Sequence, residues 1–406
     1  MTGLRTSTSL LLSSLIWLWA FSLEAQPVLP ITHEQQHLRI PQPKAVHYSN
    51  LCAFLRRKGD LYAAVQSCKQ SIALNPNYAE SRNNLAVAYA LLKQSQQAIQ
   101  SFKVAIAIAP HVPLYRLNLA YTFLQVEQLD EALTEFKICA LAGYQTAKVT
   151  DQIIAIYLKK DNYELALSTL QEARVLNPSN GSYPLQMGKI YARLGRNELA
   201  VDALEQSFRL TESAPGDLRL VAKLNFRLNR FERAVDILQR LLQKEANDAQ
   251  IYNDLGVNLM RLQRFSEAVQ AFEKSIALND KNPNPRINLA GALDRLGNPS
   301  QAEARYREAM DLDGTIPEVY NNLAVTLANQ KRYSDALPML QRALTLRTNY
   351  TDALQNMAVV LVQLKRLDEA QSTYLKLSSL STDSVEQAQF NQLARRLERL
   401  QTEQNR

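Results

Sequence analysis

The sequence predicts an all-α protein, an α-solenoid built from ten helical hairpins. Three observations predict this fold class. An alanine recurs every 34 residues, ten times, with no insertion or deletion, and a fixed period of this length is typical of helical repeat proteins. Glycine is scarce, at 11 of 406 residues, which leaves few turn residues for a strand-rich fold. The hydrophobic fraction of 46% excludes wholesale disorder.

Four columns of the repeat predict how each hairpin packs. The recurring alanines are Ala64, Ala98, Ala132, Ala166, Ala200, Ala234, Ala268, Ala302, Ala336 and Ala370. Thirteen residues before each alanine lies a large apolar residue, followed by a mostly small one; four residues after it lies an apolar or aromatic residue. We expect the small residue and the alanine to meet where two antiparallel helices approach closest. A larger side chain there would cost about 1–3 kcal/mol. The other apolar columns are expected to fill the space between hairpins.

These columns resemble the tetratricopeptide repeat family, whose 34-residue unit combines Gly or Ala, a second Ala, an aromatic residue and a closing proline. Pro76, Pro110 and Pro178 match that proline, whereas Tyr144 stands at the same position in another unit. The resemblance covers residues 45–378. It implies a right-handed superhelix of ten repeats that serves as a protein–protein interaction scaffold, with no catalysis and no cofactor.

The N-terminus is typical of a secretory signal. Arg5 precedes an apolar stretch of fourteen residues, 10–23, which is too short to span a bilayer but suits a signal peptide. We expect cleavage after Ala25, so that residues 1–25 are removed, the protein is exported to the periplasm or secreted, and no membrane span remains. An uncleaved N-terminal anchor is the alternative. Residues 26–44 contain four prolines and are predicted to form an extended linker.

The C-terminal residues 379–406 depart from the repeat and predict a single capping helix. Asp383 is a suitable N-cap residue. The apolar residues Phe390, Leu393, Leu397 and Leu400 predict one buried stripe that covers the last repeat, as the end of a solenoid requires. The same spacing would also suit a short coiled coil, so a dimer through this helix is the alternative.

A polar column on the first helix of each hairpin is the candidate partner-binding site. It consists of Asn50, Asn84, Asn118, Gln152, Gln186, Asp254, Asn288, Asn322 and Asn356, interrupted by Leu220. The column is similar to the asparagine ladder of the repeat region of O-GlcNAc transferases. That similarity implies that it binds the backbone of an extended peptide in the concave groove, since an amide both donates and accepts hydrogen bonds. The alternative is that these amides cap helices or bond across adjacent hairpins.

Two groups of basic residues follow the polar column. Seven residues after it come Lys159, Arg193, Arg227, Arg261 and Arg295, and near the turn between the helices come Arg196, Arg230, Arg264, Arg332 and Arg366. One interpretation is a positive rim for an acidic partner. The other is that cations simply stabilise helix C-termini through the helix dipole. The net charge of +7 is small for this length and does not indicate nucleic acid binding.

One motif suggests an enzyme. His33-Glu34-Gln35-Gln36-His37 matches the H-E-x-x-H pattern of zinc peptidases. It lies in the proline-containing linker without an apolar helix around it, so we expect neither a metal site nor catalysis. A remaining functional alternative is an assembly factor for pilus or polysaccharide export, by analogy with exported repeat proteins.

Three cysteines, Cys52, Cys68 and Cys139, predict one disulfide. Cys52 and Cys68 lie on the two helices of the first hairpin, each about eight residues from its expected turn near Gly59. Residues equally distant from the turn of an antiparallel hairpin lie at equal height, within the distance that a disulfide requires. We therefore predict a Cys52–Cys68 disulfide and a buried free thiol at Cys139. The alternative is that the pair only fills a tight seam.

Overall fold

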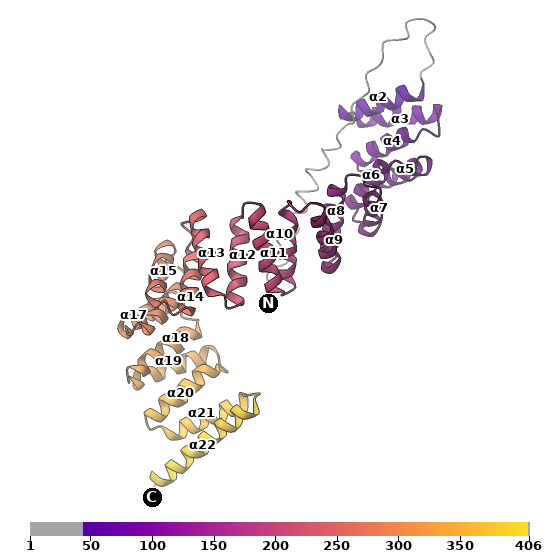
Figure 1. Cartoon of the computed structure of the whole chain (residues 1–406). Helices are drawn as coiled ribbons and strands as arrows, with labels where there is room; N and C mark the ends of the chain where they lie inside the picture. The colour runs from indigo at the N-terminus through magenta and orange to yellow at the C-terminus, as the bar shows by residue number, and fades with distance from the viewer. Residues whose placement is uncertain (1–43, 405–406) are drawn as a thin grey trace, which may run out of the picture. The chain divides into compact units, whose positions relative to one another are not determined.

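The computed structural model describes residues 44–404, and these are helical throughout, with no strand (Figure 1). The predicted signal peptide, its cleavage site, the H-E-x-x-H motif and linker residues 26–43 lie outside the described residues. None of the described helices has the length and apolarity needed to cross a bilayer.

The chain divides at Tyr144 into two compact units. In each unit the helices form antiparallel pairs, so that an even-numbered helix is the first of its pair and an odd-numbered helix the second. The first unit contains α2 (Ala45–Arg57), α3 (Leu61–Leu74), α4 (Ala79–Leu91), α5 (Ser95–Ile108), α6 (Pro113–Gln125) and α7 (Leu129–Leu141).

The second unit contains seven helical pairs and one additional helix. Its helices are α8 (Thr146–Lys159), α9 (Tyr163–Leu176), α10 (Ser182–Arg193), α11 (Asn197–Leu210), α12 (Pro215–Arg227), α13 (Phe231–Lys244), α14 (Ala249–Arg261), α15 (Phe265–Leu278), α16 (Asn284–Arg295), α17 (Pro299–Leu312), α18 (Pro317–Asn329), α19 (Tyr333–Leu346), α20 (Thr351–Gln363), α21 (Leu367–Leu380) and α22 (Ser384–Gln404). The α-solenoid of ten helical hairpins that the sequence predicts is therefore confirmed.

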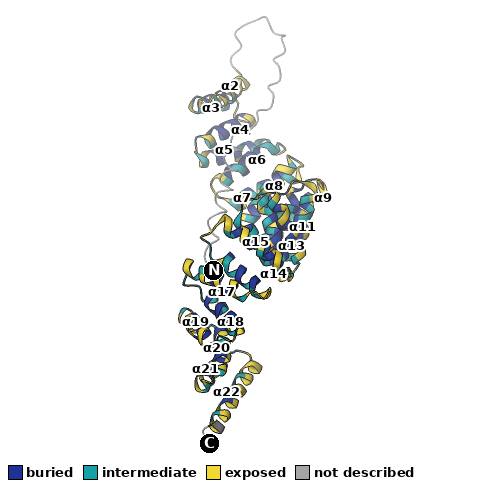
Figure 2. Ribbon diagram, turned by 90° about the vertical axis from the view of Figure 1, so that its left-hand side faces the viewer, coloured by how far each residue is buried: buried dark blue, intermediate teal, exposed yellow. Residues whose placement is uncertain are grey.

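The recurring alanines lie at the centre of each pair. All ten have no exposed surface, and Figure 2 shows buried residues between the paired helices. The small residue on the first helix meets the apolar residue that follows the alanine. A Cβ atom at Gly188 would lie 2.5 Å from Cγ of Leu204. The expectation that the apolar column fills only the space between hairpins was therefore incomplete, because it also packs inside its own pair.

The first hairpin departs from this pattern at Leu51. The equivalent residues Leu85 and Leu119 are 6% and 1% exposed, whereas Leu51 is 42% exposed. In the second repeat the equivalent Leu85 packs on the preceding hairpin, in one cluster with Cys52, Ala64 and Cys68. No described hairpin precedes α2, so the same apolar position remains at the surface.

The turn inside each hairpin has one conserved backbone geometry. The second residue after the end of each first helix adopts a positive φ in every repeat, between 54° and 87°. Only three of these ten residues are glycine; the full set is Gly59, Lys93, Glu127, Asp161, Gly195, Asn229, Gln263, Gly297, Lys331 and Lys365. A side chain in this left-handed region is strained by contact between its Cβ atom and the carbonyl oxygen. The short turn nevertheless imposes it.

Helix α22 packs along α21, as the predicted capping helix should. Ala394 and Leu397 are 1% and 6% exposed, and Phe390 stacks on Tyr374 with ring centroids 6.4 Å apart. The predicted stripe was partly wrong, because Leu393 and Leu400 are 39% and 42% exposed. The helix is rotated so that the small Ala394, rather than Leu393, lies against α21 and permits close approach.

Candidate functional site

The first helices approach one another in part of each unit. Successive first helices contact one another as α2 with α4 and α4 with α6 in the first unit, and as α14 with α16, α16 with α18 and α18 with α20 in the second, whereas α8, α10, α12 and α14 make no comparable contact in sequence. Successive second helices make no comparable contact within the described residues. Elements that approach more closely lie on the inside of a curve. We call the surface of the first helices that carries the polar column the inner face.

Four asparagines of the polar column bond to the preceding repeat. In the first unit, Nδ2 of Asn84 donates to Oγ of Ser49 at 3.2 Å, and Nδ2 of Asn118 donates to Oδ1 of Asn83 at 2.9 Å. In the second unit, Asn288 donates to Asn253 at 3.0 Å and Asn356 to Asn321 at 2.8 Å. Each bond joins residues 35 positions apart, so these side chains hold neighbouring first helices in register.

Acceptors that sequence reasoning overlooked complete these bonds. They stand immediately before the polar column, at Ser49, Asn83, Asn253 and Asn321. The signal was present in the sequence, because within the polar column a bond forms where an asparagine follows a serine or asparagine by 35 residues. Where that earlier residue is apolar, as Leu117 is for Gln152, no such bond is seen.

The remaining members of the column behave differently. Gln186 donates to Oγ of Ser182 in its own helix, at 3.1 Å. Asp254 accepts from Nε2 of Gln250 at 2.7 Å, and its burial raises the pKa of its carboxyl group. Asn322 accepts from Nδ2 of its neighbour Asn321 at 3.3 Å. Asn50 is exposed and Gln152 is half-buried. The column is thus not one uniform ladder.

The turn arginines are neutralised by carboxylates. Arg196 pairs with Glu164 at 2.6 Å and Arg230 with Glu198 at 2.5 Å, each across one repeat. The other three pair in the same way within or between repeats: Arg264 with Glu267, Arg332 with Glu303 and Asp335, and Arg366 with Glu369. This group of the predicted basic residues is therefore structural.

The other basic group ends the first helices of the second unit. Arg193, Arg227, Arg261 and Arg295 are the last residues of α10, α12, α14 and α16, and all are exposed. The guanidinium of Arg261 lies over the ring of Phe226, 5.9 Å from its centroid, and that of Arg295 lies over Phe265 at 5.1 Å.

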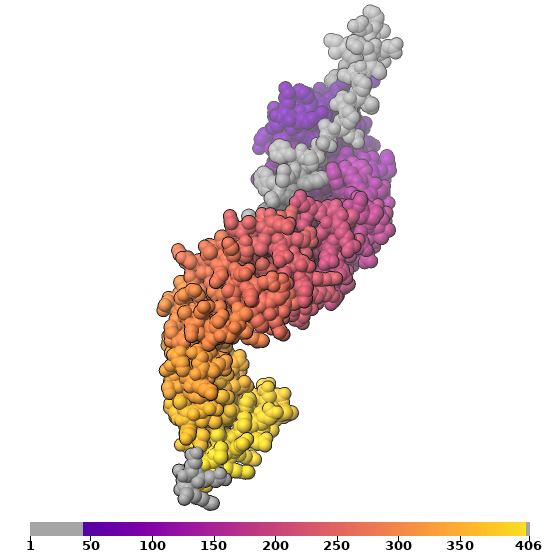
Figure 3. Space-filling model, turned by 60° about the vertical axis from the view of Figure 1, so that its left-hand side comes forward, coloured from indigo at the N-terminus to yellow at the C-terminus, as the bar shows by residue number. Residues whose placement is uncertain are grey.

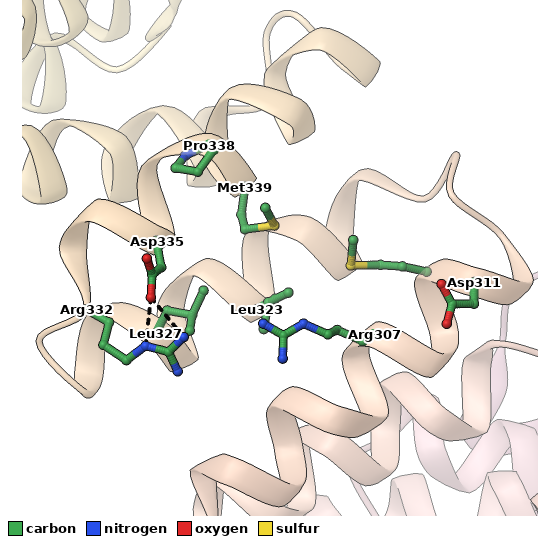
Figure 4. Close-up of a pocket in the computed structure, with 9 residues that line it drawn as sticks. Arg307, Asp311, Leu323, Leu327, Arg332, Asp335, Pro338 and Met339 are labelled. Carbon is green, nitrogen blue, oxygen red and sulfur yellow. Dashed lines mark hydrogen bonds and ion pairs between the residues drawn. The ribbon is translucent and has the colours of Figure 1, made fainter.

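A cavity of about 530 Å³ lies in the second unit, between α17 and α19. Leu323 and Leu327 of α18 form its floor (Figure 4). At its edge, the buried Glu303 pairs with Arg307 at 2.5 Å and with Arg332 at 2.7 Å. The edge charges are thus largely satisfied within the protein, and the cavity is separate from the inner face.

Cys52 and Cys68 form a disulfide in the structure, with Cα atoms 5.3 Å apart. Both residues have no exposed surface. Cys139 is a buried free cysteine whose Sγ lies 3.6 Å from the carbonyl oxygen of Pro113. The structure thus arranges the three cysteines as the sequence predicts.

No cluster of three or more metal-ligating side chains occurs among residues 44–404. The residues that suggested a zinc peptidase, His33 to His37, are outside this range, so that alternative remains a prediction about the linker.

The repeated helical hairpins define an interaction scaffold of the α-solenoid class. Four models of one family, described as tetratricopeptide repeat, match residues 44–111, 185–213, 222–283, and 259–324 with 327–396. The chain belongs to the tetratricopeptide repeat family. No curated protein matches the sequence significantly.

Several solved structures are similar in fold. The C-terminal part of a repeat protein from Cytophaga hutchinsonii is 16% identical, with a TM-score of 0.47, over 57% of this chain and 96% of that one. Yeast Tom70 is 14% identical, with a TM-score of 0.37, over 88% and 96%. YrrB, described as having an unusual peptide-binding site, is 18% identical, with a TM-score of 0.39, over 46% and 96%.

Proposed function

We propose that the inner face of the repeats binds an extended segment of a partner protein, and that the chain is a non-catalytic scaffold within an exported complex. The observation that carries the proposal is the orientation of the polar column. The Nδ2 groups of Asn84, Asn118, Asn288 and Asn356 are engaged by the preceding repeat. Their Oδ1 atoms accept no hydrogen bond from the described residues.

Such an arrangement suits the backbone of an extended chain. Because one bond already fixes each amide, the Oδ1 acceptor is oriented before a ligand arrives, and little side-chain entropy is lost on binding. Packed helices lie about 8–10 Å apart, and an extended chain advances about 3.3 Å per residue. One amide of the column would therefore meet every third backbone N–H of the ligand, irrespective of its side chains.

The experiment begins with the partner. Crosslinking of residues 26–406 in the native compartment, followed by mass spectrometry, identifies the bound segment. Its affinity is then measured for a variant with Asn288→Ala, Asn322→Ala and Asn356→Ala. We expect the affinity to fall by about 0.5–1.5 kcal/mol for each hydrogen bond lost at Asn288 and Asn356, and by less at Asn322, whose Oδ1 already accepts from Asn321, with unchanged helix content.

A matched control separates ligand binding from repeat packing. Asn253→Ala with Asn321→Ala removes the same two inter-repeat bonds from the acceptor side but leaves the Oδ1 atoms of the column in place. If the control weakens binding as much as the triple variant, the column acts only through packing and the proposal is wrong. The identity of the crosslinked partner also tests the alternative role in pilus or polysaccharide export.

Export is the second part of the proposal. The Cys52–Cys68 disulfide supports it, since disulfides persist in oxidising compartments and are rare in the cytosol. Fusion of residues 1–44 to a reporter that is active only outside the cytosol should yield activity, and N-terminal sequencing of the mature chain should begin at Gln26. If the fused reporter remained inactive, export would be contradicted. If the mature chain still began at Met1, the N-terminal segment would be an uncleaved anchor.

A further inference from the structure

The second unit carries a row of cations along its inner face. Arg193, Arg227, Arg261 and Arg295 occupy one position on four consecutive first helices. Lys189 and Lys223 lie one helical turn before the first two arginines, on the same side of their helices. We call these six residues the basic row. Its arginines lie seven residues after the polar column, which places both features on one surface.

The helix dipole alone does not account for the row. A cation at a helix C-terminus is favoured in every helix alike, yet α4, α6, α18 and α20 end in Leu91, Gln125, Asn329 and Gln363. Within the second unit the arginines stand on four consecutive first helices, and Lys189 and Lys223 stand one turn before the helix ends, whereas the first unit has a single arginine at this position, Arg57 of α2. A local concentration of charge therefore needs another explanation.

The carboxylates that face the row neutralise one of its six cations, Lys189, and leave the other five without an ion pair among the described residues. Asp217 pairs with Lys189 at 2.7 Å. Asp254 accepts from Gln250, and Asp294 accepts from Oγ1 of Thr326 at 2.5 Å. Burial raises the pKa of both of these carboxyl groups, which disfavours their charged forms.

The other nearby acids are engaged elsewhere. Glu245 and Asp248 both pair with Arg219. Among residues 44–404 the structure shows no ion pair for Arg193, Lys223 or Arg227. Arg261 and Arg295 lie over aromatic rings, which leave the positive charge in place, and the structure shows no ion pair for them in the same range.

We propose that the basic row binds an acidic, extended segment of the partner protein, with a carboxylate at about every third residue. The inference rests on the proposed function, because the same segment would continue along the inner face to the amides of α16, α18 and α20. One cation per repeat, at helix separations of about 8–10 Å, matches an extended chain that advances about 3.3 Å per residue. Figure 3 shows the repeats of the second unit in space-filling form, coloured by residue number.

A protein segment suits the row better than nucleic acid does. Single-stranded nucleic acid is bound by exposed aromatic rings that stack on its bases. Here the two rings beside the row, Phe226 and Phe265, are covered by Arg261 and Arg295. The neighbouring amides pair with a peptide backbone, which a nucleic acid lacks.

The test uses the protein from residue 26 onward and a fluorescent peptide of about 12 residues with repeating Glu-Ser-Ser units, a length that follows from the spacing above. Matched peptides carry Gln or Lys in place of Glu, and single-stranded DNA serves as an anionic probe of another class. We expect the Glu peptide to bind more tightly than the Gln peptide, and its affinity to fall as salt rises.

Two charge-reversal variants locate the binding site. Arg193→Glu with Arg227→Glu should weaken Glu-peptide binding by about tenfold or more, through the loss of attraction and the gain of repulsion. The control, Arg240→Glu with Lys274→Glu, makes the same change in net charge on exposed residues of the second helices α13 and α15 and should leave binding unchanged.

The outcomes distinguish this inference from the proposed function. Equal loss in both variants, equal binding of the Glu and Gln peptides, or tighter binding of DNA through the same arginines would each overturn the acidic partner. A Gln peptide that binds and is lost in the Asn288, Asn322 and Asn356 variant would uphold the proposed function while the inference fails. The inference is supported if Glu-peptide binding is lost in the Arg193→Glu, Arg227→Glu variant and is retained in the Arg240→Glu, Lys274→Glu control.

Discussion

Gly256 and Phe272 occupy the two positions in the seventh hairpin that Cys52 and Cys68 occupy in the first. A Cβ atom at Gly256 would lie 2.5 Å from Cε1 of Phe272, whereas Cys52 and Cys68 are joined by a disulfide. The closest approach of the two helices is thus filled either by a glycine against a ring or by a covalent bond. Both solutions bring the helices together at the same point.

This relationship predicts that Gly256→Ala destabilises the second unit. The added methyl group would overlap the Phe272 ring, and overpacking costs about 1–3 kcal/mol. Chemical unfolding followed by circular dichroism measures the change. The control is Gly291→Ala, where the nearest atom, Oη of Tyr306, is 3.8 Å away. There we expect stabilisation of up to about 1 kcal/mol from helix propensity, and equal effects of the two substitutions would contradict the packing described.

The alanine column makes a companion prediction. Ala268, fully buried at the same seam, has no room for a larger side chain, so Ala268→Phe should lower the melting temperature markedly. Gln263→Ala, at the exposed turn, should be nearly neutral, because Gln and Ala are both L-residues with a Cβ atom and are strained alike by the positive φ of 59° at this position. Equal melting temperatures of the two variants would show that the repeat phase is misassigned.

The turn geometry predicts that glycine is stabilising at Lys331. Its φ of 63° costs an L-residue about 1–2 kcal/mol, and part of this gain is offset by the greater freedom of glycine in the unfolded chain. Lys331→Gly should therefore raise the stability of the second unit by up to about 1 kcal/mol. The reverse change, Gly297→Lys, should lower it. Thermal unfolding of both variants checks the sign of each effect.

The inter-repeat amide bonds predict that Asn321→Ala is destabilising. Asn321 is 6% exposed and accepts from Nδ2 of Asn356. Its loss leaves that donor without its partner, at a cost of about 1–3 kcal/mol. Asn329→Ala, at the exposed end of the same helix, is the control and should change stability little. Unfolding of both variants at the same denaturant concentration would show that the bond between Asn321 and Asn356 does not stabilise the second unit.

The cysteine arrangement predicts one free thiol. Denatured but unreduced mature protein should react at Cys139 alone, because Cys52 and Cys68 are bonded to each other; three reactive thiols would rule the bridge out. Reduction opens a loop with a sequence separation of 16 residues, and such a crosslink contributes about 3 kcal/mol. The effect should be confined to the first hairpin.

The pH dependence of Cys139 follows from its burial. Burial raises the pKa of its thiol to about 11, from an ordinary value near 9.0. The folded chain keeps a proton that the unfolded chain releases, so this contribution to stability is complete below pH 9 and is lost as the pH rises through about 11. Alkylation at pH 8 should be negligible in the folded protein and complete in denaturant. Fast alkylation of the folded form would contradict the burial.

The sequence predicts the fold well because the repeat is regular. The alanine column marks the centre of every hairpin, and Gly59, Gly195 and Gly297 already mark the turn column. The amide bonds were less accessible, since they depend on pairs such as Asn253 with Asn288 rather than on one column. The rotation of α22 could not be predicted, because Leu393 is as apolar as Leu397 and only contact with α21 decides between them.

The bonds between repeats have a consequence for how the chain folds. The side-chain bond from Asn356 to Asn321 spans 35 residues, and the ion pair from Arg230 to Glu198 spans 32. Each hairpin thus finds its partners within about one repeat of its own sequence, and contacts of such low order form rapidly. A chain that emerges slowly, from a ribosome or through a translocation channel, can therefore complete each hairpin against the previous one before the remainder has appeared.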